Sequence, residues 1–347
     1  MIQTEALIIG AGPVGLFQAF QLGLQDIRCH VVDALPQVGG QCVELYANKP
    51  IYDIPGLPYC TGQQLIDQLQ QQVKPFAPQF HLQELVSDLK TTEDGQWHVQ
   101  TDKGTMFKAA TVFIAAGVGA FVKRGLSLPG FDELLGQQIF HQPPTPTSFK
   151  GKHLVVLGDS DAALAACAQW RQGPAAATSV TLVHRRDQFQ AEPQAIEDMR
   201  QACANQAMRF VAGQPTGLVQ TNNLLTGLEI LNAQGDSEVL PADALLLCLG
   251  VSPKLGPISD WGLAMERKQL PVNTETYATA AKGIFAVGDI NTYPGKKKLI
   301  LCGFHEATLA AFGASALLRP DQKTLLQYTT TSKHLQKLLG RVVESKL

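Results

Sequence analysis

The sequence lacks an excess of either charge, and it lacks a long apolar run. Its 347 residues carry 28 Lys and Arg against 30 Asp and Glu, a net charge of −2, so the overall charge does not favour nucleic acid or an anionic membrane as a partner. The purely apolar runs, such as residues 244–249, are far shorter than the roughly 20 residues of a membrane-spanning helix. The first residues lack the basic stretch of a secretion signal. These absences predict a cytoplasmic protein that binds neither nucleic acid nor membrane.

Closely spaced cysteines and metal-binding histidines are also missing. The 7 cysteines are widely spaced, and no two are separated by only two residues, which excludes a zinc knuckle and a Cys-x-x-Cys redox motif. The 8 histidines show no H-x-x-x-H spacing, so we expect no metal site. No serine–histidine–acid or paired-carboxylate pattern indicates hydrolysis. We therefore expect a chemistry other than hydrolysis.

What the sequence does contain is a phosphate-binding turn near its start. A short apolar strand at residues 6–9 runs into Gly10-Ala11-Gly12-Pro13-Val14-Gly15, and a helix follows. In such a turn the first glycine bends the chain, the second lets the backbone approach a pyrophosphate, and the third lets the helix pack on the strand. The next strand ends on Asp33, where an acid accepts hydrogen bonds from an adenosine ribose. This unit predicts a bound dinucleotide.

A second, degraded copy of the unit follows the proline-rich residues 143–147. Here serine stands where the second glycine should be, which requires a backbone that avoids positive φ or tolerates strain. The following strand ends on two arginines, at the place where basic side chains accommodate a 2′-phosphate. We therefore predict an NADPH site at the ends of the second unit's strands, formed by Gly158, Ser160, Asp161, His184, Arg185, Arg186 and Gly250.

The order of these segments predicts an α/β protein with two doubly wound, Rossmann-like domains. The first strand–helix–strand unit is followed by antiparallel strands with a turn at Asp94-Gly95. The second unit is followed by strands with turns at Asn222-Asn223 and Gln234-Gly235. A strand at 284–289 with an acidic terminus comes next, and then a helix from about 303 to 318. This order implies that residues 119–283 are inserted into a domain made of residues 1–118 and 284–347.

Several blocks resemble the thioredoxin-reductase-like ferredoxin–NADP reductases, and the resemblance covers essentially the whole chain. The blocks are Gly39-Gly40-Gln41-Cys42, residues 49–56, residues 283–290, residues 292–296, residues 303–307 and a tail at 327–332. The resemblance implies FAD in the first domain, NADPH in the inserted one, and a homodimer. It also implies hydride and electron transfer between NADPH and a one-electron carrier, ferredoxin or flavodoxin.

The same resemblance assigns roles to individual residues. Tyr52 and Tyr328 match aromatic positions that stack on the two faces of the flavin ring. The tail would reach over the flavin, and Asp289 would bind the ribityl chain, with the following helix N-terminus near the flavin pyrimidine. With the first glycine turn and Asp33, the implied FAD site includes Gly40, Gln41, Tyr46, Val86, Gly117, Phe121, Asp289 and Thr330.

Two departures from the family leave alternatives open. The chain has no cysteine between Cys60 and Cys167, which excludes the dithiol route of thioredoxin reductases. The altered second glycine turn admits a different FAD-dependent NAD(P)H reductase or diaphorase, or a non-catalytic flavin-binding redox sensor. The run Lys296-Lys297-Lys298 is either a docking site for an acidic carrier or an ordinary solvated loop.

Overall fold

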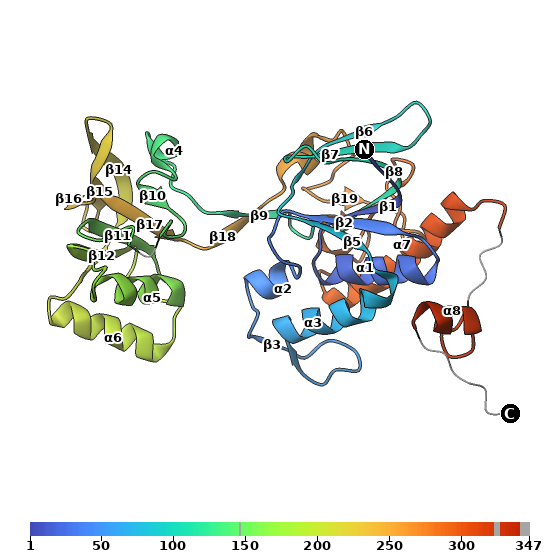
Figure 1. Cartoon of the computed structure of the whole chain (residues 1–347), viewed down its shortest axis with the longest axis horizontal. Coiled ribbons are helices and arrows are strands. Elements are labelled where there is room, and N and C mark those ends of the chain that lie inside the picture. Colours follow the sequence, from blue (N-terminus) through green and yellow to red (C-terminus); the bar gives the residue numbers. More distant parts are fainter. Residues whose placement is uncertain (146, 323–326, 341–347) are drawn as a thin grey trace. The chain divides into compact units, whose positions relative to one another are not determined.

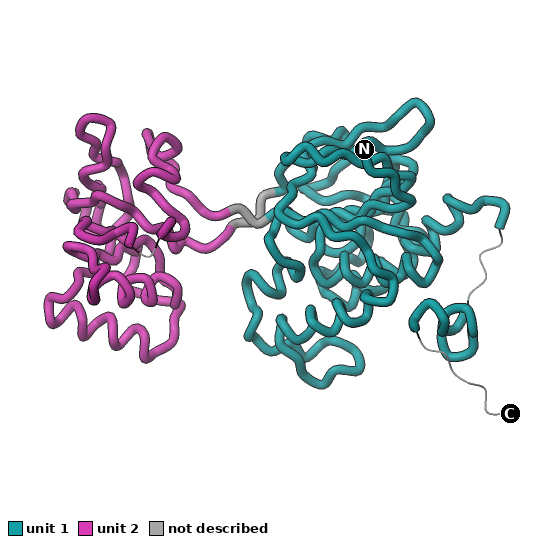
Figure 2. Tube along the Cα trace, in the orientation of Figure 1, with its two compact units in different colours: residues 1–121, 253–347 teal, residues 122–252 magenta. Residues whose placement is uncertain are grey.

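The chain folds into two compact units, one inserted into the other. The computed structural model describes residues 1–145, 147–322 and 327–340, with the backbone alone for residues 121, 122 and 252–254. Unit 1 is Met1–Phe121 with Pro253–Leu347, and unit 2 is Val122–Ser252 (Figure 2). The α/β class and the pair of doubly wound units are confirmed.

The return to unit 1 lies well before the predicted boundary at 283/284. Residues 253–283 belong to unit 1 by their contacts, because Ile258 and Leu270 are buried in the same cluster as Val99 and Ile284. The sequence between 253 and 283 carries no regular apolar period, so nothing local in the sequence indicates where it packs.

Unit 1 is built on a seven-stranded sheet in the order β5-β2-β1-β8-β7-β6, with β20 also pairing with β8 (Figure 1). Strands β1, β2, β5, β8 and β20 are parallel, and β6 and β7 complete an antiparallel meander. The strands are β1 (Ile2–Ile9), β2 (Cys29–Asp33), β5 (Gln79–Leu82), β6 (Val86–Thr91), β7 (Trp97–Thr101), β8 (Met106–Ile114) and β20 (Ile284–Ala286).

Helices and short pairs complete unit 1. The helices are α1 (Pro13–Leu24), α2 (Gln41–Glu44), α3 (Gly62–Val73), α7 (Ile300–Leu318) and α8 (Lys333–Leu338), with 3-10 turns η1 (Lys74–Phe76), η2 (Gly256–Asp260) and η3 (Gly288–Ile290). Two short pairs are β3 (Pro50–Ile51) with β4 (Cys60–Thr61), and β19 (Leu270–Pro271) with β21 (Asn291–Thr292). Helix α3 begins where Thr61 and Gln64 form a reciprocal capping box.

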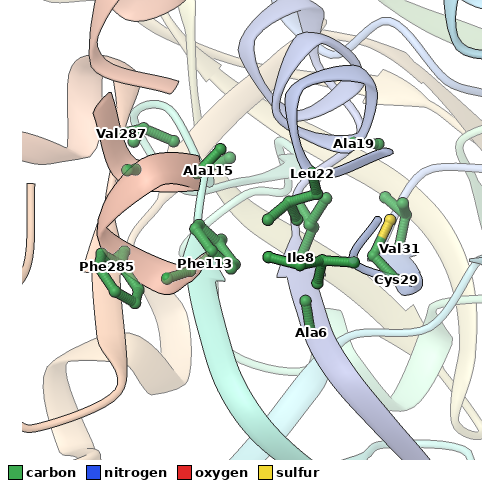
Figure 3. Close-up of a cluster of buried hydrophobic side chains, with 14 of the residues drawn as sticks. Ala6, Ile8, Ala19, Leu22, Cys29, Val31, Phe113, Ala115, Phe285 and Val287 are labelled. Carbon is green, nitrogen blue, oxygen red and sulfur yellow. The ribbon is translucent and has the colours of Figure 1, made fainter. Parts of the chain in front are cut away.

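The main core of unit 1 lies between the parallel strands and helices α1 and α7. Figure 3 shows side chains of β1, β2, β8 and β20, such as Ile8, Val31 and Phe113, gathered beside Ala19 and Leu22 of α1. Phe113 stacks on Phe285 with ring centroids 4.9 Å apart. This packing fixes the N-terminus of α1 at the carboxyl ends of the strands, as a doubly wound fold requires.

Helix α7 is long and apolar enough to meet the length and composition of a membrane-spanning helix. Apart from Glu306, its buried residues are small: Gly303, Ala307, Ala310, Ala311, Ala314 and Ser315. Small side chains let two helices approach closely, and α7 packs along α1. In this structure α7 is thus a core helix of unit 1.

Unit 2 repeats the doubly wound plan. Its parallel sheet has the order β10-β17-β11-β12-β13; α5 and α6 cover one face and a three-stranded antiparallel sheet covers the other (Figure 1). The elements are β10 (Ile139–Phe140), β11 (His153–Gly158), β12 (Ser179–His184), β13 (Arg209–Ala212), β14 (Gln214–Thr221), β15 (Leu224–Leu231), β16 (Ser237–Pro241), β17 (Ala244–Cys248), α4 (Phe131–Leu134), α5 (Asp161–Trp170) and α6 (Pro193–Ala204). The chain passes between the units in β9 (Ala120–Lys123) and β18 (Val251–Lys254), which pair.

The tail is anchored at the carboxyl end of α1. His334 of α8 lies 2.6 Å from the Asp26 carboxylate, and Leu339 packs against the core cluster that contains α1. Helix α1 has 12 residues, a length of about 18 Å. The anchor therefore lies at the opposite end of α1 from the first glycine turn.

Candidate functional site

Unit 1 contains an open pocket at the carboxyl edge of its parallel strands. It has about 1240 Å³ of empty space, its open mouth included, which suffices for a large ligand. The lining comes from the first glycine turn, the ends of β2 and β8, residues 84–86, α2, residues 255–261 and the start of α7. Ligands of open α/β sheets bind at this edge.

The first glycine turn has the shape that a pyrophosphate needs. A Cβ on Gly10, whose φ is +109°, would lie 2.5 Å from the Ala115 carbonyl oxygen, and one on Gly15 would lie 1.9 Å from that of Gly10. A Cβ on Gly12 would meet nothing within 4 Å, so Gly12 borders open space. Gly12 is also the N-cap of α1 and offers no side chain to the first free N–H groups. The turn therefore fits a phosphate-bearing cofactor.

A second helix N-terminus opens into the same pocket. Helix α7 begins at Ile300 with Leu299 as its N-cap, and no side chain caps its first N–H groups. Leu299, Ile300 and Asp289 all line the pocket. The start lies slightly before the predicted one near residue 303. Two helices thus direct positive dipole ends and free N–H groups at one pocket.

Asp33 is held in place by the turn that it faces. Its carboxylate accepts hydrogen bonds from the Ala11 N–H (2.6 Å) and the Leu35 N–H (2.8 Å), and the residue lines the pocket. Burial raises the pKa of Asp33, although these two N–H groups act to lower it. The carboxylate is therefore oriented to accept hydrogen bonds from a ligand, at a cost in desolvation.

Replacing Asp33 by asparagine should raise the FAD dissociation constant about ten- to hundredfold, because hydrogen bonds to a charged acceptor contribute about 1.5–3 kcal/mol. In the parent protein FAD affinity should fall as the pH drops through the raised pKa of Asp33, since protonation removes an acceptor. A raised folded-state pKa means that the apo protein gains stability from this group at low pH and loses it as the pH rises.

Fluorescence titration of apo protein with FAD across pH measures both effects. Asp243→Asn is the matched control, because Asp243 also accepts a backbone N–H, that of His153 at 2.7 Å, and neither residue lines the pocket. An Asp33→Asn protein with wild-type FAD affinity at every pH would remove Asp33 from the site.

Most of the other residues assigned to FAD border this pocket. Gly40, Gln41, Tyr46, Val86 and Gly117 line it, as do Gly10, Gly12, Pro13, Val14, Asp33 and Asp289. The Cys42 thiol donates to the Tyr46 hydroxyl oxygen at 3.6 Å. Burial, above all, raises the pKa of Tyr46, so its hydroxyl stays protonated. Gly15 packs under the turn, and the side chain of Phe121 lies outside the described residues.

The two tyrosines assigned to the flavin faces do not line the pocket, and neither does Thr330. The Tyr52 side chain is 69% exposed and packs against Tyr59 with ring centroids 5.9 Å apart. Tyr328 is 64% exposed and precedes the α8 anchor at Asp26. The structure therefore does not bring Tyr52 or Tyr328 together with the pocket.

The residues assigned to NADPH gather at the carboxyl edge of unit 2's parallel sheet. Gly158 ends β11, His184 ends β12 and Gly250 follows β17, and these three strands are neighbours. Gly158 has φ +153°, and a Cβ there would lie 2.4 Å from the Cys248 carbonyl oxygen. Ser160 has φ −100° and is the N-cap of α5, so serine at this place causes no backbone strain.

The two acids of this turn, Asp159 and Asp161, contact groups within unit 2. The Asp161 carboxylate accepts from the Glu192 N–H at 2.8 Å, and Asp159 lies 3.7 Å from His184. His184 also contacts the Arg186 carbonyl oxygen at 3.0 Å. Arg185 and Arg186 are exposed, and no carboxylate of the described residues forms an ion pair with either. Two arginines at a strand end are thus available to bind phosphate.

Sequence reasoning missed part of the pocket wall. Glu84 and Lys298 line it, as do Leu255, Pro257, Ile258 and Trp261. Glu84 lies two residues before Val86, and its N–H donates to the Asp33 carbonyl oxygen at 3.0 Å. The closeness of Glu84 to Val86 in the sequence is therefore the one signal that indicates it. Residues 255–261 come from the segment assigned to the other domain, and only tertiary packing places them here.

Two doubly wound units, each with a glycine turn at the carboxyl edge of a parallel sheet, define an oxidoreductase with two dinucleotide-binding sites. The chain belongs to the pyridine nucleotide-disulphide oxidoreductase family, which matches residues 4–308. The names of its most similar relatives identify the group within that family.

Those relatives are ferredoxin–NADP reductases. The chain is 53% identical over 344 residues to that of Polaromonas sp. strain JS666, covering 98% of this chain and 93% of the relative. It is 54% identical over 351 residues to that of Paracidovorax citrulli, covering 98% and 97%. The recognition made from the sequence blocks is confirmed.

Solved structures support the fold. Lactococcus lactis thioredoxin reductase aligns with a TM-score of 0.56 at 21% identity, covering 91% of this chain and 99% of that one. The bacillithiol disulfide reductase of Staphylococcus aureus aligns with a TM-score of 0.60 at 17% identity, covering 93% and 100%. At such identities the likeness concerns the fold alone.

Proposed function

We propose that this chain is an FAD-dependent ferredoxin–NADP reductase, which passes electrons between NADPH and ferredoxin or flavodoxin. One observation carries the proposal: a single pocket where two uncapped helix N-termini and two carboxylates, Asp33 and Asp289, converge. Relatives above 50% identity bear that name over nearly their whole length.

The unit 1 pocket would hold FAD through groups that each suit one part of it. Gly12 and the α1 N-terminus bind the pyrophosphate, Asp33 accepts from the adenosine ribose, and Asp289 accepts from the ribityl hydroxyls. The α7 N-terminus at Leu299 and Ile300 supplies positive potential where reduction deposits negative charge. Bound FAD supplies both two-electron exchange with nicotinamide and one-electron exchange with a carrier.

Tyr52 and Tyr328 are proposed to cover the faces of the flavin ring, and an aromatic cover excludes water. Because neither residue lines the pocket here, the β3–β4 loop or the tail must move, or a second copy must supply the ring. Exposed aromatic side chains such as these suit a partner surface, and we propose a homodimer on that ground. Sedimentation equilibrium measures the assembly state.

Unit 2 would bind NADPH at its own glycine turn. Gly158, Ser160 and Gly250 border the place for the pyrophosphate at the ends of β11 and β17, and Asp161 holds the neighbouring loop through the Glu192 N–H. Arg185 and Arg186 would bind the 2′-phosphate, with His184 fixing the Arg186 backbone.

The lysine run near the pocket divides into two parts. The Lys296 side chain is only 7% exposed and pairs with Glu306, so it cannot dock a partner. Lys297 and Lys298 are exposed, and Lys298 borders the pocket, so we propose that these two lysines meet an acidic carrier.

All seven cysteines are free thiols, which supports the proposed cytoplasmic location.

Rapid mixing of the purified, FAD-loaded protein with NADPH tests the function. We expect a yellow protein that is bleached faster by NADPH than by NADH and is reoxidised by ferredoxin or flavodoxin, with a Michaelis constant for ferredoxin that rises with salt. A colourless protein that FAD cannot reconstitute contradicts the proposal. Bleaching without reoxidation by either carrier indicates a different flavin reductase, and no bleaching indicates a sensor.

A further inference from the structure

Glu306 is a buried carboxylate that no part of the proposed reaction uses. It lies on α7 with no exposed surface. One oxygen accepts from the Gly288 N–H (2.7 Å) and the Asn291 side-chain amide (2.8 Å). The other accepts from the Tyr293 hydroxyl (2.9 Å) and the Lys296 ammonium (2.5 Å). The carboxylate is therefore fully satisfied by four donors.

All four donors come from the segment that follows β20 and carries part of the pocket wall. Gly288 and Asp289 line the pocket, and so do Lys298, Leu299 and Ile300 just beyond it. Burial raises the pKa of Tyr293, and its hydrogen bond with Glu306 acts in the same direction, so the hydroxyl remains a donor. Glu306 thus ties the wall of the pocket to the second turn of α7.

The ion pair holds Gly288 by both of its backbone polar groups, which belong to the two peptide groups on either side of its Cα. Glu306 accepts from the N–H of Gly288, and the Lys296 ammonium donates to the carbonyl oxygen of the same residue at 2.8 Å. Gly288 has φ +80°, and a Cβ there would touch Val14 at 3.4 Å. Gly288, which contacts Val14 of the first glycine turn and precedes Asp289, is therefore fixed at its N–H and at its carbonyl oxygen.

A buried ion pair of this kind is poor evidence for stability, because apolar residues of similar size often stabilise a core as well. Its clearest effect here is geometric. We propose that Glu306 and Lys296 are positioning residues of the flavin pocket: their ion pair fixes the Gly288 backbone so that Asp289 and the α7 N-terminus face the cofactor. This role rests on the proposed FAD site in unit 1.

The two charges allow a test that separates positioning from simple structural support. Glu306→Gln leaves Lys296 positive and unpaired beside the pocket wall, whereas Lys296→Met leaves Glu306 negative. We expect each variant to raise the FAD dissociation constant at least tenfold. The flavin midpoint potential should move up in Glu306→Gln and down in Lys296→Met, because reduction adds negative charge to the bound ring. Loss of structural support alone would not produce opposite shifts.

The double variant Glu306→Gln/Lys296→Met keeps the size of both side chains and buries no lone charge. It should keep an apo melting temperature near that of wild type, return the midpoint potential toward wild type, and still bind FAD more weakly. It therefore tests the proposal even where a single variant does not fold. Asp94→Asn and Lys108→Met are the matched controls, since this ion pair lies elsewhere in unit 1 and outside the pocket wall.

Apo protein is titrated with FAD, and the loaded protein with a reductant of known potential. Wild-type affinity in all Glu306 and Lys296 variants, or shifts of potential in the same direction, overturns the positioning role. A wild-type protein that does not bind FAD instead refutes the function proposed for unit 1, so the two failures are distinguishable.

Discussion

Gly12→Ala should weaken FAD binding at least about a hundredfold and leave the fold intact. A Cβ at this position meets nothing within 4 Å, and Gly12 has φ −69° and ψ −177°, which alanine adopts without strain. Loss of glycine at an N-cap costs a few tenths to about 1 kcal/mol, and the lower chain entropy of alanine offsets about as much. The added methyl group, however, occupies the space through which the backbone approaches the pyrophosphate.

We therefore expect an apo melting temperature within a few degrees of wild type and a dissociation constant for FAD at least about a hundredfold higher, a loss of roughly 3 kcal/mol. Differential scanning fluorimetry and fluorescence titration measure the two quantities. Gly15→Ala is the informative comparison, because its Cβ would lie 1.9 Å from the Gly10 carbonyl oxygen and should destabilise the fold itself. Gly12→Ala protein that purifies with FAD would contradict a pyrophosphate at this turn.

Replacing Arg185 and Arg186 together by alanine should convert a preference for NADPH into indifference between NADPH and NADH. Both arginines are exposed at the end of β12. A charge-assisted hydrogen bond to phosphate contributes about 1.5–3 kcal/mol. We expect the Michaelis constant for NADPH to rise about a hundredfold, with that for NADH changed less than about threefold.

Steady-state kinetics with an artificial acceptor measure this change without ferredoxin. Arg209→Ala is the matched control: Arg209 is an exposed arginine of unit 2 that pairs with Glu238, and it begins β13, at the edge opposite the proposed site. Equal losses for the two nucleotides in the Arg185/Arg186 variant would remove the 2′-phosphate assignment.

The two glycine turns could be predicted from the sequence because their physics is local. Gly10, Gly12 and Gly15 are required by contacts within one strand–turn–helix unit, and Asp33 follows at the end of the next strand. The same holds for Gly158 and for the arginines after β12. A pattern of glycines, a strand and a charged terminus therefore located both turns before any tertiary contact was known.

Features that depend on long-range packing were not predictable in this way. Lys296 stands in a run of three lysines, which usually indicates solvated side chains, yet it is buried because Glu306 accepts from it. The segment 255–261, which follows the inserted unit 2 in the sequence, contributes residues to the unit 1 pocket. Tyr52 and Tyr328 were assigned by resemblance, and no local property of the sequence indicates how far each lies from the pocket.

The insertion also determines the order in which the units are completed during synthesis. All residues of unit 2 are contiguous, Val122–Ser252, whereas the unit 1 sheet lacks β20, and its core lacks α7, until the ribosome has passed residue 318. Domains that fold as they emerge usually do so from the N-terminus onward. Here the apolar side chains of β1, β2 and β8 that pack against α7 stay exposed until α7 has been synthesised. Unit 2 is encoded later than these strands, but its whole chain is synthesised before α7. This interval is when the growing polypeptide most needs chaperone protection.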